Sequence, residues 1–251
     1  MSLKQTLELS LSLAKAEFKL RNEGSYLGIF WYLLNPLLMF VLLFLVFSDR
    51  LGGNIPNYPA YLLLGIIIFN FFQQATTEST RVIYQYRGII RSIRFPHGAL
   101  IASIVFRTFF SHIFEIILFI ILALIFSSSV YGIVFYPLIL IFLFVFIYGI
   151  SLILSALTVY IVDLENIWAF LVKLIWLGTP IFYAIGGQTR LFYVNLFNPL
   201  YYFITMARDV VVYMKIPELW MIFAAIAYCL LFLFFGMLIF NKLKTKFAEL
   251  I

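Results

Sequence analysis

Uninterrupted apolar stretches organise this chain. No charged residue occurs from position 24 to position 48, or from position 116 to position 162. A helix needs about 20 apolar residues to cross the bilayer core, so the second stretch is too long for one crossing. The serine-rich sequence at 127–132 is its natural break. We predict six membrane-spanning helices, at residues 28–47, 58–74, 100–126, 133–160, 167–185 and 219–240.

The first 23 residues form an amphipathic pattern that is too polar to span. Apolar residues recur at helical spacing, at Leu3, Leu7, Leu11, Ala14 and Phe18. This pattern favours a helix that lies in the membrane interface. Three basic residues are candidates to bind an anionic lipid headgroup or a pyrophosphate: Lys15, Lys19 and Arg21. The alternative is a simple membrane anchor.

A second amphipathic segment lies between the second and third predicted spans. Arg87, Arg91 and Arg94 fall at i, i+4 and i+7, which places them on one face of a short helix. The other side carries isoleucine, at positions 89, 90 and 93. A basic amphipathic helix in this position can lie on lipid headgroups or dock into the groove of a partner protein.

Composition agrees with a membrane protein. The chain has 251 residues, of which 65% are hydrophobic and 11% are charged, whereas soluble domains are about half apolar. This excludes a water-soluble fold and predicts a single all-α transmembrane domain over residues 1–251. The net charge of +6 is clustered beside the spans, so it indicates topology and not nucleic-acid binding. Basic residues concentrate before the first span, at 81–94 and at 242–246, which places both termini and the 81–94 loop in the cytoplasm.

The stretch from 186 to 217 lies outside by this topology, yet it is rich in aromatic residues. The sequence Asn198-Pro199-Leu200 can start a helix, because proline is tolerated in a first turn. We predict two short re-entrant helices that dip into the outer leaflet. An interfacial aromatic belt is the alternative.

Four ionisable residues fall inside predicted spans, where charge is costly. His112 and Glu115 are spaced to pair, and Arg107 can snorkel to the cytoplasmic surface. The fourth is Lys173, which can face a cavity or a partner subunit. A structural pair at His112 and Glu115 is the simpler interpretation, and a proton relay is the other.

Enzymatic motifs are absent from the sequence. There is no G-x-x-x-x-G-K-[ST] loop for ATP, no H-E-x-x-H and no G-x-S-x-G. The single cysteine, Cys229, cannot form a metal-binding pair or an intrachain disulfide. We therefore expect a chain that is not an enzyme and that holds no cofactor or metal.

Four segments carry a resemblance to a known family. These are LGIFWYLLNPLL at 27–38, RSIRFPHGAL at 91–100, DLENIWAFLVKLIWLGTPIFY at 163–183 and NPLYYFITMARDVV at 198–211. With the order of the spans, they resemble the membrane (permease) subunit of type-two ABC exporters, in the polysaccharide-export branch for O-antigen, capsule and teichoic acid. Two positions depart from the family pattern, with Val162 where arginine is common and Lys173 where a neutral residue is common.

The resemblance implies a homodimer in the cytoplasmic (inner) membrane, with two copies of a separate cytoplasmic ABC ATPase that binds ATP and Mg. The substrate would be a lipid-linked glycan. The segment between spans two and three would be the coupling helix, with Arg87, Arg91, Arg94 and Phe95 toward the ATPase. Aromatic rings suit sugar faces, so the candidates for the substrate pathway are Trp31, Tyr32, Tyr58, Tyr61, Phe69, Trp176 and Tyr183.

Three other functions stay open. A permease of the same fold could carry a drug or a lipid. A secondary transporter or channel could use Glu115 and His112, although we find no inverted repeat of the kind expected there. A membrane-bound glycan enzyme would need an acidic catalytic cluster, which the sequence lacks.

Overall fold

A computed structural model describes residues 3–23, 28–92, 96–126 and 131–250, and in these ranges the chain is helical, with no strand. The α-helices are α1 (Leu3–Asn22), α2 (Phe30–Leu51), α3 (Tyr58–Ser79), α4 (Val82–Gln85), α5 (Arg87–Ser92), α6 (His97–Ile125), α7 (Tyr136–Thr158), α8 (Leu164–Gly178), α9 (Thr189–Leu196), α10 (Pro199–Val211), α11 (Leu219–Leu243) and α12 (Phe247–Leu250). Short 3-10 helices are η1 (Gly52–Asn54), η2 (Tyr131–Phe135) and η3 (Lys244–Lys246).

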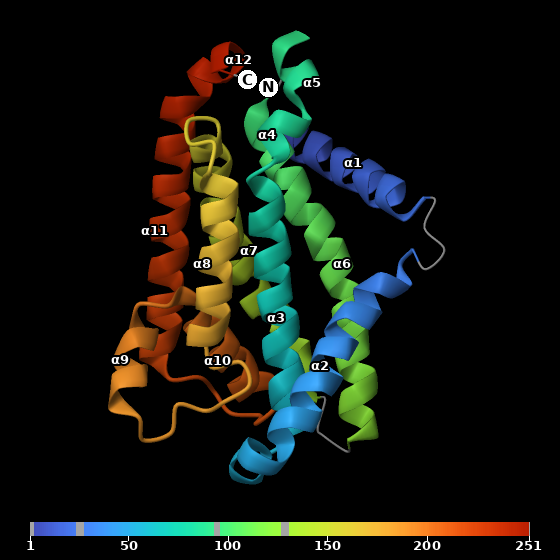
Figure 1. Cartoon of the computed structure of the whole chain (residues 1–251), viewed down its shortest axis with the longest axis vertical. Helices are drawn as coiled ribbons and strands as arrows, with labels where there is room; N and C mark the ends of the chain where they lie inside the picture. Colours follow the sequence, from blue (N-terminus) through green and yellow to red (C-terminus); the bar gives the residue numbers. More distant parts are fainter. Residues whose placement is uncertain (1–2, 24–27, 93–95, 127–130, 251) are drawn as a thin grey trace.

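The long helices form an elongated bundle (Figure 1). At one end lie α4, α5, α12 and the beginning of α1, and at the other end lie α9 and α10. We call these the α5 end and the α10 end. α8 runs from the α5 end toward the α10 end and contacts α3 and α7.

Five helices in the described ranges are long and apolar enough to cross a membrane: α2, α3, α6, α7 and α11, with η1, η2 and η3 extending three of them. The prediction of an all-helical membrane protein is therefore confirmed. These five helices match five of the predicted spans, with ends that differ by a few residues.

The fifth predicted span, 167–185, differs from the structure. α8 has fifteen residues and ends at Gly178, so it is about 22 Å long and shorter than a bilayer core. The cause is Pro180, because proline forces the preceding residue out of helical conformation. Thr179 has an extended backbone, with ψ of 136°.

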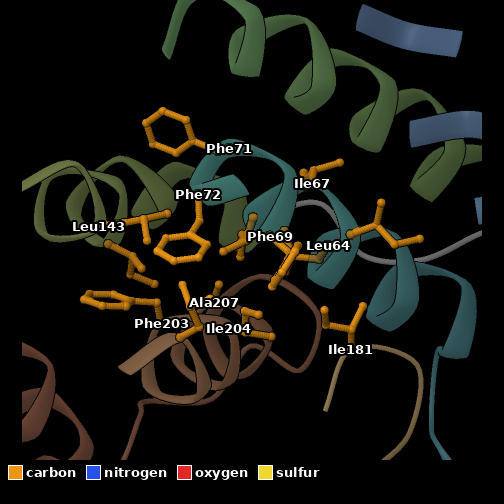
Figure 2. Packing of buried hydrophobic residues seen from close by; sticks show 14 of the residues in the cluster. Leu64, Ile67, Phe69, Phe71, Phe72, Leu143, Ile181, Phe203, Ile204 and Ala207 are labelled. Carbon is orange, nitrogen blue, oxygen red and sulfur yellow. The ribbon is translucent and has the colours of Figure 1, made fainter. Parts of the chain in front are cut away.

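α3 is the most deeply buried of the five long helices. Phe69 and Phe72 pack against Phe203, Ile204 and Ala207 of α10 (Figure 2). The apolar character of α3 therefore reflects a protein core on nearly all sides. The same contacts seat α10 against the bundle. α10 begins as predicted at Asn198, whose side chain accepts a hydrogen bond from the Leu200 amide at 3.1 Å.

α1 forms over nearly the whole predicted range, but it does not give its entire apolar face to lipid. Ala14 is fully buried, and α1 packs along α6. The Phe18 ring stacks on Tyr32 of α2 and on Phe114 of α6, with centroid distances of 5.7 and 6.2 Å. Leu7 and Leu20 stay exposed. The helix is thus attached to the bundle by one face.

α7 and α11 cross backbone to backbone at Gly149 and Gly236. A Cβ atom on Gly149 would lie 2.6 Å from the carbonyl carbon of Phe232, and a Cβ on Gly236 would overlap the Gly149 carbonyl oxygen. Small residues permit this close approach of membrane helices. The pair makes the most extensive helix contact in the described chain.

Candidate functional site

α5 presents basic side chains at its end of the bundle. Arg87 and Arg91 are exposed, as predicted, and Ile90 is buried against Val82 and Ile83 of α4. Ile89 differs from the expected pattern because it is more than one-third exposed. The predicted coupling residues Arg94 and Phe95 lie outside the described residues.

The C-terminal helix braces α5 from the side. α12 contacts α5, and the Phe247 ring is fully buried in the same apolar cluster as Ile90. Phe247 packs edge-on against His97 and Phe240, with centroid distances of 5.8 and 5.7 Å. The packing of α5 therefore involves a helix that begins about 155 positions later in the sequence.

An ionic cluster lies next to α5 and joins α1, α3 and α6. Arg107 of α6 contacts Glu17 of α1 at 2.7 Å and also contacts Glu78 of α3. Arg21 of α1 contacts the other oxygen of Glu78 at 2.8 Å. With Tyr86, these four residues make up what we call the Arg107 network. The four charged members, Glu17, Arg21, Glu78 and Arg107, line a polar cavity of about 450 Å³.

Tyr86 connects the Arg107 network to α5. Its hydroxyl donates a hydrogen bond to Glu17, and its carbonyl oxygen accepts from the amides of Ile89 and Ile90 at 3.0 Å. Burial raises the pKa of the Tyr86 hydroxyl, and the hydrogen bond to Glu17 raises it further. Tyr86 is therefore a protonated donor at neutral pH, and a movement of α5 must be transmitted to Glu17.

The charges of the Arg107 network balance, with two arginines and two carboxylates. Glu17 is 9% exposed, so both partners in its pair with Arg107 have lost most of their hydration. Arg21, a predicted headgroup ligand, is committed to Glu78 in this conformation. Lys15 and Lys19 are exposed, and Lys19 lies 3.6 Å from Glu23.

Another ion pair, at the same end, links the turn between α3 and α4 to α8. Arg81 Nε donates to Glu165 at 2.7 Å. Val162, where the family pattern has arginine, is exposed close by in sequence. The pairing at this corner is therefore made by a residue that directly follows α3.

The predicted pathway aromatics do not share one surface. Trp31 is 44% exposed, whereas Tyr32 is buried beside α1. Phe69 is buried and meets the partly exposed Trp176 edge-on at 4.8 Å. The other three lie toward the α10 end: Tyr58, Tyr61 and Tyr183.

Tyr183 belongs to the chain that follows α8, and Tyr58 and Tyr61 of α3 form hydrogen bonds to that chain. The Tyr58 hydroxyl donates to the carbonyl oxygen of Phe182 at 2.9 Å, and the Tyr61 hydroxyl donates to that of Tyr183 at 2.8 Å. Tyr58 and Tyr61 are buried, so their rings do not offer a free face to a sugar in this conformation.

Arg208 completes this arrangement, and it does not figure among the predicted site residues. The sequence places it in the stretch 186–217 on the outer side, and the structure shows that its side chain is buried, with 3% exposure. It donates hydrogen bonds to the carbonyl oxygens of Tyr61, Pro180 and Ile181. One signal was available, because position 208 shares the helix face of the apolar residues Ile204, Ala207 and Val211.

The predicted pair of His112 and Glu115 is confirmed. The His112 Nδ1 atom lies 2.8 Å from Glu115, and its Nε2 atom lies 2.8 Å from the hydroxyl of Tyr136. Asn70 of α3 contacts the other Glu115 oxygen at 3.4 Å. All three members of the His–Glu–Tyr chain are at most 3% exposed, which favours a structural role over a proton relay.

Comparison with known families decides the class of this bundle. A family model described as ABC-2 type transporter matches residues 8–212, from α1 to the end of α10. The chain belongs to the ABC-2 type transporter family. The prediction of a type-two ABC permease is therefore confirmed, and the match includes α5, the Arg107 network and Arg208.

Relatives of this ABC-2 permease resemble it over nearly their whole length. An O-antigen export system permease protein RfbA from Myxococcus xanthus is 26% identical over 245 residues, which cover 96% of this chain and 94% of the relative. Two proteins of the same name from Klebsiella pneumoniae are 29% and 27% identical, and each alignment covers 97% of this chain and 95% of the relative.

Proposed function

We propose that this permease is the transmembrane subunit of an ATP-driven exporter that moves a lipid-linked, O-antigen-like polysaccharide from the cytoplasm to the outer face of the membrane. The observation that carries this proposal is the full-length similarity to permeases named for O-antigen export. The sequence has no P-loop of its own. ATP and Mg would therefore bind to a separate ABC ATPase, present in two copies.

In the proposed topology, the α5 end faces the cytoplasm and the chain crosses the inner membrane six times. The basic residues that precede α2, flank α5 and follow α11 support this orientation. α8 would be the fifth of these six crossings, completed by the extended residues that follow Gly178. Both termini are then cytoplasmic, and α9 and α10 form the re-entrant pair on the outer side.

α5 is the proposed contact with the ATPase. Arg87 and Arg91 are exposed on this helix. The helix packs against the bundle through Ile90, which lies in the same apolar cluster as Phe247. Arg94 and Phe95, which follow α5 in the sequence, are also proposed as coupling residues. Because Tyr86 ties α5 to Glu17, a push on α5 would also move α1.

The proposed assembly is a homodimer. One side of α8 is apolar and exposed along its length, which suits a second copy of the chain. The exposed residues are Ile167, Phe170, Leu171, Leu174 and Leu177. Lys173 is also exposed on α8, so it would lie near the subunit boundary or the pathway.

The substrate contacts are proposed in two places. Lys15 and Lys19, with Arg21 if its pair with Glu78 opens, would meet the anionic pyrophosphate or headgroup at the cytoplasmic surface. Trp31, Trp176 and Tyr183 have accessible ring surface in this conformation. Tyr32, Tyr58, Tyr61 and Phe69 would line the pathway only after the helices separate.

Charge reversal on α5 tests this function. We expect the double variant Arg87→Glu with Arg91→Glu to insert normally, to lose the co-purifying ATPase and to lose glycan from the cell surface. Arg190→Glu is the matched control, because Arg190 is an exposed arginine on α9 at the opposite end. Normal surface glycan in the double variant would remove α5 from the mechanism.

A further inference from the structure

The chain between α8 and α9 is an unwound segment held by side chains. We call residues 179–183 the unwound segment. Four of its carbonyl oxygens accept hydrogen bonds, all from side chains of α3 or α10. The acceptors are Pro180, Ile181, Phe182 and Tyr183, and the donors are Arg208, Tyr58 and Tyr61. Non-helical backbone at membrane depth persists only where protein or water satisfies it in this way.

Arg208 is the donor that joins the unwound segment to two helices at once. Its Nη1 and Nη2 atoms donate to the consecutive carbonyls of Pro180 and Ile181, at 2.6 and 2.7 Å. Its Nε atom donates to the Tyr61 carbonyl of α3 at 3.1 Å, and its guanidinium carbon lies 3.4 Å from the centroid of the Tyr61 ring. A planar guanidinium makes parallel bonds of this kind, and the ammonium of lysine does not.

The charge of Arg208 is buried without a carboxylate partner among the described residues. Burying a cation is costly unless its hydrogen bonds are made. Here three backbone carbonyls accept the hydrogen bonds of the guanidinium, and the Tyr61 ring makes a cation–π contact with it. The contacts with the unwound segment are therefore what offsets the cost of burying this cation.

α3 is shaped to admit this guanidinium. Gly65 faces it, and a Cβ atom at that position would lie 2.5 Å from Nη2 of Arg208 and 3.3 Å from the Ile181 carbonyl oxygen. Any larger residue at position 65 would displace either the guanidinium or the unwound segment. The site is therefore built from α3 and α10 together, around one side chain.

We propose that Arg208 is a positioning residue that keeps the unwound segment closed against α3 between transport cycles and thereby sets the closure of the pathway at the α10 end. This inference rests on the proposed export function for its meaning. The position of the segment can nevertheless be measured without substrate or ATPase. When Arg208 releases the carbonyls of Pro180 and Ile181, the hydroxyls of Tyr58 and Tyr61 are the side-chain donors that remain among the described contacts, and both are uncharged.

Cysteine accessibility tests the proposal. The only native cysteine is buried, so a Cys229→Ala background allows one reporter, Ile181→Cys, at a side chain that is fully buried here. A membrane-impermeant maleimide is applied to intact spheroplasts and to inside-out vesicles. We expect Arg208→Lys to raise labelling of the reporter by about tenfold, the change that follows loss of a hydrogen bond to a charged group.

Gly65→Ala is a second variant, because it displaces the guanidinium without removing it. Gly53→Ala is the matched control, since an added Cβ at Gly53 has nothing within 4 Å. We expect Gly65→Ala to behave as Arg208→Lys does, with membrane levels and ATPase co-purification equal to those of the control. A merely structural role would lower the protein level without changing labelling of the protein that remains.

Unchanged labelling in both variants would overturn the proposal. Loss of protein in both variants, with a normal level for Gly53→Ala, would also overturn it, because Arg208 would then hold the fold and not the segment. Increased labelling from the cytoplasmic face alone would support the role of Arg208 and contradict the proposed topology. Failure of the export proposal is thereby distinguished from failure of this inference.

Discussion

The hydroxyl of Tyr86 donates a hydrogen bond to the carboxylate of Glu17. Tyr86 directly precedes α5, and Glu17 lies near the end of α1. This bond links α5 directly to α1, and the sequence presents these two as separate amphipathic helices. Glu17 in turn holds Arg107, so the same contact reaches the membrane-spanning α6.

Tyr86→Phe should loosen the link while keeping the ring. We expect the ATPase to stay bound and active, with less glycan exported for each ATP hydrolysed, because one hydrogen bond worth about 0.5–1.5 kcal/mol is lost. The ratio is measured in proteoliposomes. Tyr84→Phe is the control, since Tyr84 is exposed and makes no comparable bond to α1 among the described contacts. Equal ratios for the two variants would contradict the role of Tyr86.

The same bond predicts a pH dependence of stability. The pKa of Tyr86 is raised in the folded protein, so the neutral hydroxyl is favoured and its contribution is fully present below the unfolded pKa of about 10. That contribution is lost as the pH rises above this value. The difference in melting temperature between the parent and Tyr86→Phe should therefore be constant from about pH 7 to 9 and should shrink near pH 11. A difference that shrinks already at pH 8 would refute this.

Arg107 should contribute far more than Arg81 to the free energy of unfolding. Arg107→Gln leaves Glu17 and Glu78 without their buried partner, and we expect the free energy of unfolding to fall by about 3–5 kcal/mol. Arg81→Gln removes an exposed pair with Glu165 and should cost about 0.2–1 kcal/mol. The stability of both variants is measured by heating them in detergent and recording the loss of the monodisperse chromatographic peak. A similar loss in both variants would show that burial does not set the strength of the Arg107 pairs.

The glycine crossing of α7 and α11 should tolerate no side chain. Gly149→Ala or Gly236→Ala places a methyl group on the opposing backbone, so the helices must separate at a cost of about 1–3 kcal/mol. Gly187→Ala has nothing within 4 Å of the added atom and serves as the control. The melting temperature in detergent distinguishes them, and an unaffected Gly236→Ala would mean that the crossing is looser than described.

Phe247→Ala should detach α12 from α5. Truncating a buried phenylalanine typically costs about 3–5 kcal/mol, and here that loss falls on the packing between α5 and the bundle. We expect a lower yield of co-purified ATPase from membranes that contain a normal amount of permease. Leu250→Ala, at an exposed position on the same helix, should leave the yield unchanged. Equal yields for both variants would separate α12 from the proposed coupling role.

The spans could be predicted because bilayer thickness sets a minimum length of apolar sequence, and α2, α3, α6, α7 and α11 satisfy it. The start of α10 at Asn198 and the pairing of His112 with Glu115 were also predictable, because both depend on residues two or three positions apart. Contacts between residues this close in the sequence follow from the helix geometry itself, so they can be predicted without knowing the rest of the fold.

Partners distant in the sequence could not be predicted. Tyr58 and Tyr61 were predicted as aromatic faces for sugar, but their hydroxyls bond carbonyls about 120 positions away. Counting charges places Arg208 on the outer side of the membrane, but it does not show whether the side chain is buried against other helices. Pro180 ends α8 early, but the sequence alone does not show that Arg208 donates hydrogen bonds to the carbonyl oxygens left without helical partners.

The contact between Gly149 and Gly236 also limits which helices can move relative to one another. Two helices whose main chains touch cannot slide without collision, so α7 and α11 form a stationary spine. We therefore expect that α1, α2 and α8, and not α7 or α11, change position during the proposed transport cycle. Spectroscopic probes placed across the spine should accordingly report a constant separation while probes from α8 to the spine report a changing one.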